Sequence, residues 1–537
     1  MALAAGCAAH HPVDTGGPAA PFFEGLGTWR RPVTTTSREA QKYFDQGLIL
    51  AYGFNHAEAE RSFREAAKLD PECAMCWWGA ALVVGPNINA AMEPAAAPRA
   101  WEAITRAKKA KGASPLERGL IDALSKRYAK KPPENRSGLD KAYADAMRQV
   151  ALAHPGDPDV RTLFAESMLD MRPWDQWQPD GTPQPGTLEL VGQLEAVLKM
   201  APEHPGAMHY YIHATEGSKT PERALDAAER LGDVVPGAGH LVHMPAHTWF
   251  RLGRYHDAAE ANRKAEQVDS RYISQCHAQG VYPLAYVPHN PHFGWAAAAM
   301  AGEKSAALAF ADATLRHTDT SMLREPGLES LQHYSLIPLW ARTRFGMWDD
   351  ILAAPAPPED LRYPAGIRHY ARGLALARTG RAGEARAELD ALRAIAADAG
   401  LERITIWNIN SAQAVLAIAV QALTGEIAAT EGRIDDAVEA LTEGVRLEDG
   451  LRYNEPPDWH YPVRQTLGAV LLQAGRAEEA EAVYRADLQV FPENGWALFG
   501  LAKSVEVEGK ASEAADARER FASAWAHADI EISASRF

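Results

Sequence analysis

Two six-residue segments near the end of the chain, Gly475-Arg-Ala-Glu-Glu-Ala480 and Gly509-Lys-Ala-Ser-Glu-Ala514, are variants of one phrase and begin 34 residues apart. A glycine followed by a polar, alanine-rich stretch marks a turn between two helices, because glycine ends the first helix and the amphipathic pattern of the second begins at once. The same phrase recurs earlier in the chain, at residues 253–258, 302–307, 346–351, 380–385 and 432–437. This repetition predicts an all-α solenoid of stacked helix-turn-helix units.

A related segment lies near the start of the chain, where Asn55-His-Ala-Glu-Ala59 is followed by Leu69-Asp-Pro71. Together these segments resemble the tetratricopeptide repeat (TPR), a helix-turn-helix unit of about 34 residues. The resemblance covers most of residues 37–530 and implies a right-handed superhelix of roughly eight to ten helical pairs around a concave groove. Longer gaps between some of the phrases indicate insertions between repeats.

Composition excludes several classes of function. The 537 residues carry a formal net charge of -15 and give a pI near 5.7, which argues against binding to nucleic acid or to an anionic membrane surface. We find no run of 18 apolar residues, so we predict no transmembrane segment. We expect a disordered tail at 1–36, TPR-like helices at 37–200 with a Trp/Pro-rich loop at 172–186, histidine-rich repeats at 201–320 and C-terminal repeats at 321–537.

The cysteines bear on localisation. Leu3-Ala-Ala-Gly-Cys7 resembles the end of a bacterial lipoprotein signal, in which the cysteine is lipidated, although only six residues precede it. A truncated start would make the protein a periplasmic or membrane-anchored lipoprotein with a lipid anchor at Cys7; otherwise it is cytoplasmic. Cys73 and Cys76 are predicted to form a short disulfide in an exported protein and to be buried thiols in a cytoplasmic one.

Histidines concentrate in one part of the chain. Twelve of the 19 lie in residues 204–333, within three segments that read His209-Tyr-Tyr-Ile-His-Ala-Thr-Glu216, His240-Leu-Val-His-Met-Pro-Ala-His247 and His289-Asn-Pro-His292. The TPR resemblance implies that first-helix positions 2, 5, 9 and 12 face the groove when the turn glycine is position 15. Counted back from Gly253 and Gly302, the second and third segments place their histidines at positions 2, 5 and 9, and at 2 and 5.

This register predicts a metal site. Residues at i, i+3, i+4 and i+7 share one helix face, and imidazoles from neighbouring helices can reach one ion. We therefore predict that the histidines converge, and that one or two transition-metal ions (Cu, Fe or Zn) are bound. The alternative is a polar, pH-sensitive binding surface without metal. The predicted ligands are His209, His213, Glu216, His240, His243, His247, His289 and His292.

Other residues are candidates for chemistry or recognition. Glu216, Tyr210 and Tyr282 lie in or beside the histidine segments and are candidate catalytic groups. The loop at 172–186 is expected either to fold over the site or simply to pack between repeats. The weaker candidates for substrate contact are Trp174, Trp177, His333, Trp459, His460 and Arg464.

Three functions remain open from the sequence. The first is a metal-dependent enzyme, a hydrolase or an oxidase/oxygenase, which acts on a small molecule or peptide bound in the groove. The second is an adaptor that docks a peptide or partner protein there, and the third is copper or zinc storage or delivery. The histidine segments resemble those of a subgroup of bacterial TPR proteins, but that resemblance implies no reaction.

Overall fold

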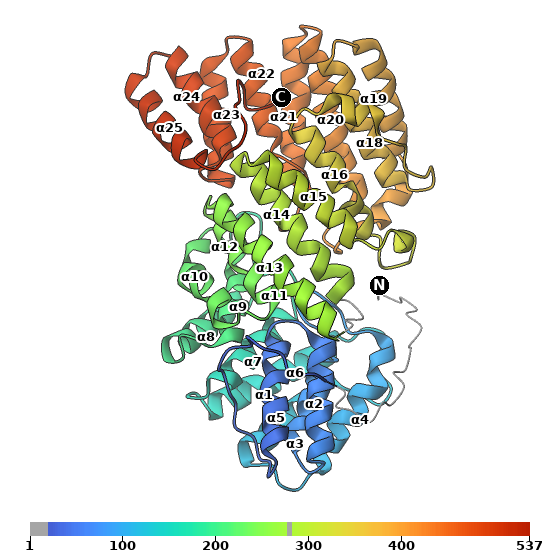
Figure 1. The fold of residues 1–537 in the computed structure, drawn as a ribbon, viewed down its shortest axis with the longest axis vertical. Coiled ribbons are helices and arrows are strands. Elements are labelled where there is room, and N and C mark those ends of the chain that lie inside the picture. Colours follow the sequence, from blue (N-terminus) through green and yellow to red (C-terminus); the bar gives the residue numbers. More distant parts are fainter. Residues whose placement is uncertain (1–19, 277–281) are drawn as a thin grey trace. The chain divides into compact units, whose positions relative to one another are not determined.

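The computed structural model of the protein describes residues 20–276 and 282–537, and this part of the chain is almost wholly helical (Figure 1). Cys7 lies outside the described residues, so the lipid anchor remains a prediction. By their internal contacts the residues divide into two compact units, Met1–Thr248 with Lys264–Val287, and Trp249–Arg263 with Pro288–Phe537. The predicted all-α class is confirmed.

The helices of the first unit are α1 (Arg38–Tyr52), α2 (His56–Leu69), α3 (Ala74–Leu82), α4 (Ala97–Lys109), α5 (Pro115–Leu124), α6 (Ser137–Ala153), α7 (Pro158–Leu169), α8 (Thr187–Met200), α9 (Pro205–Glu216), α10 (Leu225–Val234) and α11 (Gly239–His243). Two helices, α12 (Pro245–Arg251) and α13 (Tyr255–Cys276), have residues in both units. Because α9 packs on α1, α7 and α8, residues 201–248 belong with the N-terminal helices, which differs from the predicted boundary at residue 200.

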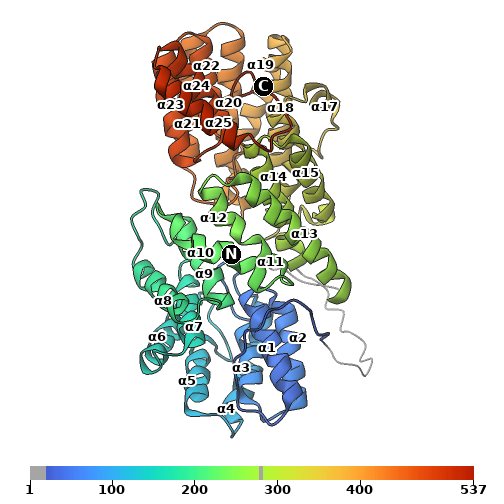
Figure 2. The ribbon, with the colours of Figure 1, turned by 60° about the vertical axis from the view of Figure 1, so that its left-hand side comes forward.

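The second unit contains α14 (Val287–Ala301), α15 (Lys304–His317), α16 (Leu331–Arg344), α17 (Trp348–Ala353), α18 (Arg362–Arg378), α19 (Ala382–Ala396), α20 (Ala412–Thr430), α21 (Ile434–Asp449), α22 (Val463–Gln473), α23 (Ala477–Val490), α24 (Gly495–Val507) and α25 (Ala511–Ala524). Its strands β1 (Thr405–Ile406) and β2 (Asn410–Ser411) form one short antiparallel ladder, with Thr405 opposite Ser411. Figure 2 shows these helices from a second side.

The predicted turns between helices are confirmed. All seven phrase glycines adopt left-handed backbone, with φ between 64° at Gly346 and 79° at Gly380. Glycine adopts this conformation without the steric penalty that a Cβ atom brings. The helix pairs α18/α19, α20/α21, α22/α23 and α24/α25 follow one another in this way, so the second unit is a run of TPR-like repeats.

Residues 20–36 are ordered, which corrects the expected disordered tail over this stretch. Arg31 lies buried and contacts Asp157 at 2.9 Å and Asp159 at 3.0 Å. Trp29 donates its indole N–H to the same Asp159 at 3.1 Å. The stretch is ordered because the cation of Arg31 and the indole of Trp29 find partners at the start of α7, which composition alone does not reveal.

Cys73 and Cys76 are joined by a disulfide at the start of α3, where Cys73 also accepts a hydrogen bond from the Cys76 N–H. Among the described residues one helix, α20, is long and apolar enough to cross a membrane by length and composition alone. Its most apolar window is 61% buried, and α20 packs against α18, α19 and α21, as the core helix of a folded unit does.

Candidate metal centre

Helix α9 carries the first group of polar side chains. The His204 side chain caps the helix by accepting from the Ala207 N–H, and Pro205 follows at a position suited to the first turn. His209, His213 and Glu216 are then spaced i, i+4 and i+7, so they share one face. Every residue of α9 is buried, and these polar groups therefore require partners inside the protein.

Helix α11 carries the second group of polar side chains. It spans only five residues before Pro245 begins α12, and His240, His243 and His247 are all buried. The spacing i, i+3 and i+7 keeps these three imidazoles on one side, as the repeat register predicts. All three belong to the first unit, as do the side chains of α9.

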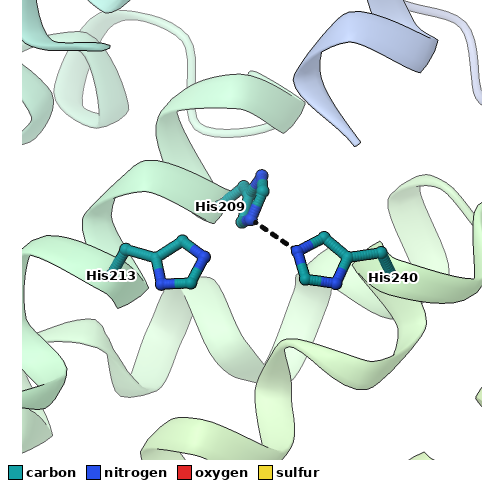
Figure 3. Close-up of side chains that lie close together, drawn as sticks. All are labelled: His209, His213 and His240. Carbon is teal, nitrogen blue, oxygen red and sulfur yellow. Dashed lines mark hydrogen bonds between the residues drawn. The ribbon is translucent and has the colours of Figure 1, made fainter. Parts of the chain in front are cut away.

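Three imidazoles from α9 and α11 meet in the first unit (Figure 3). One ring nitrogen each from His209, His213 and His240 lies within 4.8 Å of the others. The Nε2 atoms of His209 and His240 are 3.2 Å apart. The three side chains are at most 3% exposed, so the structure brings these predicted ligands together in a site shielded from water.

The tautomer of His209 follows from its second nitrogen. Nδ1 lies 2.6 Å from the backbone carbonyl oxygen of Tyr52, which can only accept, so Nδ1 carries the proton. The Nε2 lone pair then faces His240. Burial, reinforced by the nearby His213, lowers the pKa of His209 well below its usual value, which keeps the ring neutral. His209 is thereby prepared to act as a nitrogen ligand.

Glu216 holds two histidines at once. Its Oε1 lies 3.0 Å from His213 Nδ1, and its Oε2 lies 2.7 Å from His247 Nδ1. Burial alone would raise the pKa of Glu216, but the attraction of His247 and His213 outweighs it and lowers the pKa to about 2. Since an ionised carboxylate only accepts, the hydrogen bond to Oε1 places the proton of His213 on Nδ1 and leaves its Nε2 lone pair available. The Nε2 of His213 has no hydrogen-bond partner among the described residues.

A second close pair continues the cluster. The Nε2 atoms of His243 and His247 are 2.8 Å apart, and the His240 and His243 ring centroids are 5.7 Å apart. Six of the predicted ligands therefore lie in one continuous cluster of the first unit. We call this the histidine cluster, defined by His209, His213, Glu216, His240, His243 and His247.

Two aromatic residues with unusual backbone cover the histidine cluster. Phe54 has a φ of 58°, and its ring centroid is 4.5 Å from that of His209 and 5.5 Å from that of His240. Trp174 has a φ of 57° and lies 5.6 Å from His213. Bulky residues seldom adopt this conformation, which is found most often at functional sites. Sequence reasoning missed Phe54, although it stands at the turn position where the other repeats have glycine.

The candidate tyrosines lie beside the cluster. Tyr282 donates to Asp269 at 2.7 Å and accepts from the His240 backbone N–H at 3.3 Å, so it positions α11. The Tyr210 ring centroid is 5.2 Å from that of His209. Burial, with the nearby carboxylate of Glu166, raises the pKa of Tyr210 well above its usual value. Burial, with the nearby Asp269, raises the pKa of Tyr282 in the same way, so both phenols are neutral and can donate or accept a hydrogen bond.

Of the predicted ligands, His289 and His292 belong to the second unit. There His292 is buried beside His333, with ring centroids 5.4 Å apart, and His333 Nδ1 lies 2.9 Å from the Tyr363 hydroxyl. Neither ring nitrogen of His292 has a hydrogen-bond partner among the described residues. The predicted convergence of His289 and His292 with the α9 histidines remains a prediction.

The remaining weak candidates separate by position. Trp174 contacts the His213 ring on α9, and Trp177 donates to the Ala214 carbonyl of the same helix at 2.8 Å. Loop 172–186 therefore folds onto the histidine cluster. In the second unit Trp459 and His460 pack against the buried Trp340. Arg464 pairs with Asp449 at 2.5 Å.

Comparisons with known proteins assign neither a family nor a function to this chain. No family model and no curated protein matches the chain. A human IFIT1 dimer with m7Gppp-AAAA is 12% identical, with 92% of this chain and 91% of that chain covered and a TM-score of 0.33. The APC/C hetero-tetramer Cut9–Hcn1 is 10% identical, with 90% and 73% covered and a TM-score of 0.31. Similarity this low supports no inference about binding or chemistry, and the repeat assignment rests on this chain's own turns and helix pairs.

Proposed function

We propose that the first unit binds a transition-metal ion through the Nε2 atoms of His209, His213 and His240, and that the protein is a metal-dependent enzyme. One observation carries the proposal. In this buried site, two of the three imidazoles have their Nδ1 protons engaged by acceptors, Tyr52 O and Glu216, which leaves their Nε2 lone pairs for a shared ion. Metal-ligating histidines are typically held in this way.

The spacing of the nitrogens supports the same conclusion. Two imidazole nitrogens bound to one tetrahedral ion at about 2.0–2.1 Å stand about 3.3–3.4 Å apart. The 3.2 Å between His209 Nε2 and His240 Nε2 is close to this value. His213 completes a set of three after a small side-chain rotation, because its nitrogen already lies within 4.8 Å of the others. An all-imidazole set suits Zn, Cu or Fe.

Three protein ligands favour an enzyme over storage. A catalytic zinc site typically has three protein ligands and keeps a position open for water or substrate, whereas structural and storage sites close the shell with a fourth. Such an ion would supply Lewis acidity or an activated water. Within this proposal Glu216 does not bind the metal as the sequence suggested but orients His213 and His247, because both of its oxygens face their Nδ1 atoms.

Elemental analysis of the protein purified without a histidine tag tests metal binding. We expect about one equivalent of a transition metal, lost in His209→Ala, His213→Ala and His240→Ala while the helical circular dichroism remains. His256→Ala is the control, because His256 pairs with Glu303 in the second unit. Less than about 0.3 equivalents after reconstitution would exclude the proposal.

Spectroscopy of the cobalt-substituted protein tests the open position. We expect the visible absorption of the bound Co²⁺ to shift when azide or another small anion is added, because the anion can occupy a free coordination site. His243→Ala and His247→Ala should then leave the cobalt bound. If these variants lose the metal and the anion has no effect, the shell is closed and storage or delivery becomes the better explanation.

A further inference from the structure

The last residues of the chain lie on the repeats of the second unit. After α25 ends at Ala524, residues 529–537 run back along this unit and end beside α20 and α22 (Figures 1 and 2). Ser535 is 1% exposed and Arg536 8% exposed, although they belong to a segment without helix or strand. We call residues 529–537 the tail.

The tail contacts first-helix positions that the TPR resemblance assigns to the concave side of a solenoid. Counted from Gly432 as position 15, Glu426 is position 9, and it forms an ion pair with Arg536. In the following repeats Gln465 is position 5 and Trp496 is position 2. Ser535 donates to the Gln465 backbone oxygen at 2.7 Å, and the Phe537 ring centroid lies 5.8 Å from that of Trp496. Each of the last three residues thus meets a different repeat.

These contacts combine a hydrogen-bonded hydroxyl, a buried ion pair and an aromatic contact, as a specific peptide-binding site does. The serine hydroxyl is held between the Gln465 carbonyl and the Tyr484 hydroxyl, which lies 2.7 Å away. The Arg536 guanidinium meets a carboxylate that is itself 4% exposed. Opposite charges paired away from water discriminate strongly against other side chains, because a mismatched residue leaves one of them unpaired.

The site can release the tail without leaving the buried Glu426 carboxylate unpaired. Arg378 Nη1 lies 3.8 Å from the same Glu426 oxygen that pairs with Arg536. When Arg536 leaves, Arg378 therefore remains as a counter-ion for the carboxylate. The two arginines also repel each other, and burial together with the charge of Arg536 lowers the pKa of Arg378. A tail that served only to cap the solenoid would need neither the second cation nor this repulsion.

We propose that the patch of the second unit that the tail covers, defined by Glu426, Gln465, Tyr484 and Trp496, is a peptide-binding site that the tail occupies in cis. Its ligands are segments of other chains in which a serine precedes an arginine and an aromatic residue, and they bind in competition with the tail. This site is independent of the metal proposed in the first unit.

Binding of a labelled peptide tests the competition. The probe is fluorescein-labelled Ile530–Phe537 peptide, read by anisotropy with the full chain and with a chain lacking residues 534–537. We expect the probe to bind the shortened chain at least about tenfold more tightly than the full chain, because only there is the site open. A shortened chain with unchanged circular dichroism that binds no probe would overturn the proposal.

Two matched variants test which contact carries the recognition. Glu426→Gln in the shortened chain should weaken probe binding by about tenfold or more, since it leaves the arginine of the probe without its carboxylate. Glu431→Gln, at the end of the same helix, should not, because Glu431 pairs with the exposed Arg386 and Arg433. Equal binding of a probe carrying Arg536→Ala would contradict the proposed site.

A third measurement applies if the shortened chain does not fold. A protease site inserted between the exposed Ala526 and His527 allows the tail to be cut after folding. We expect the cut tail to exchange with the labelled probe. A cut chain that keeps its tail and takes up no probe would assign these residues a purely structural role and overturn the proposal.

Discussion

At the scale of single residues, Phe54 shows how one substitution in a repeat can mark a site. It stands two residues before α2, the position at which seven other repeats have a left-handed glycine, and it keeps the same positive φ. A side chain in this conformation costs about 1–2 kcal/mol. This unfavourable backbone conformation occurs where the phenyl ring of Phe54 covers His209 and His240.

Comparison of Phe54→Gly with Phe54→Ala isolates this strain. Both variants lose the buried ring and should be destabilised, but only glycine relieves the left-handed backbone. We therefore expect Phe54→Gly to exceed Phe54→Ala in free energy of unfolding by about 1 kcal/mol, measured by urea titration. Equal values would show that the backbone at this turn relaxes and stores no strain.

Glu216 should give the first unit a characteristic response to acid. Its pKa is lowered from 4.5 to about 2, so its contribution to stability is complete above about pH 4.5 and is lost as the pH falls towards 2. We expect Glu216→Gln to reduce the free energy of unfolding by about 2–3 kcal/mol at pH 7 and to flatten its fall between pH 4.5 and pH 2. The exposed Glu222→Gln serves as control, and an unchanged acid profile in Glu216→Gln would contradict the assignment.

The same variant should affect metal affinity more than structure. Removal of a carboxylate that orients ligating histidines typically lowers affinity by about 10–100-fold. We expect this loss in Glu216→Gln by competition with a chromophoric chelator, with metal still bound at saturation. Complete loss of metal would instead indicate that Glu216 is itself a ligand.

At the scale of helices, close crossings depend on glycines in the first helix of each pair. A Cβ atom on Gly425 of α20 would stand 2.5 Å from Leu441 Cγ of α21, and one on Gly468 of α22 would stand 2.5 Å from the Tyr484 ring. Because these glycines have no side chain, each first helix can pack closely against the second helix of its pair. A Cβ atom on Gly383 of α19, by contrast, would have no other atom within 4 Å.

Alanine substitutions should therefore have opposite effects in neighbouring pairs. Gly425→Ala overpacks the α20/α21 crossing and should lower the free energy of unfolding by about 1–3 kcal/mol. Gly383→Ala meets open space and should raise it by about 0.4–1 kcal/mol, because alanine restricts the unfolded chain and favours helix. Chemical denaturation of both variants gives the comparison, and a loss of stability in Gly383→Ala would refute the crossing argument.

At the scale of the whole molecule, the chain has two compact units, and each contains one of the proposed sites. The histidine cluster lies in the first, and the tail-binding site lies in the second. Hydrogen exchange should report on each unit separately. Zn²⁺ should increase protection in α9 and α11, because the ion joins these two helices, and should leave α22 and α24 unchanged. Equal protection of both regions would argue against a site confined to the first unit.

The sequence by itself determined the helix pairs and their turns, because glycine conformation and the spacing of apolar residues act locally. It also determined which histidines share a helix face, since i, i+3 and i+4 neighbours follow from helix geometry alone. These local rules were sufficient to predict the TPR-like solenoid and the concentration of imidazoles in α9 and α11.

Only the tertiary structure decided which atoms of those imidazoles are available. The Tyr52 carbonyl that fixes the tautomer of His209 is 157 residues away in sequence, and the Glu426 partner of Arg536 is 110 residues away. The double engagement of Glu216 and the cover by Phe54 likewise depend on contacts between separate helices. Such contacts follow from how helices pack and how buried polar groups find partners, and no local pattern in the chain encodes them.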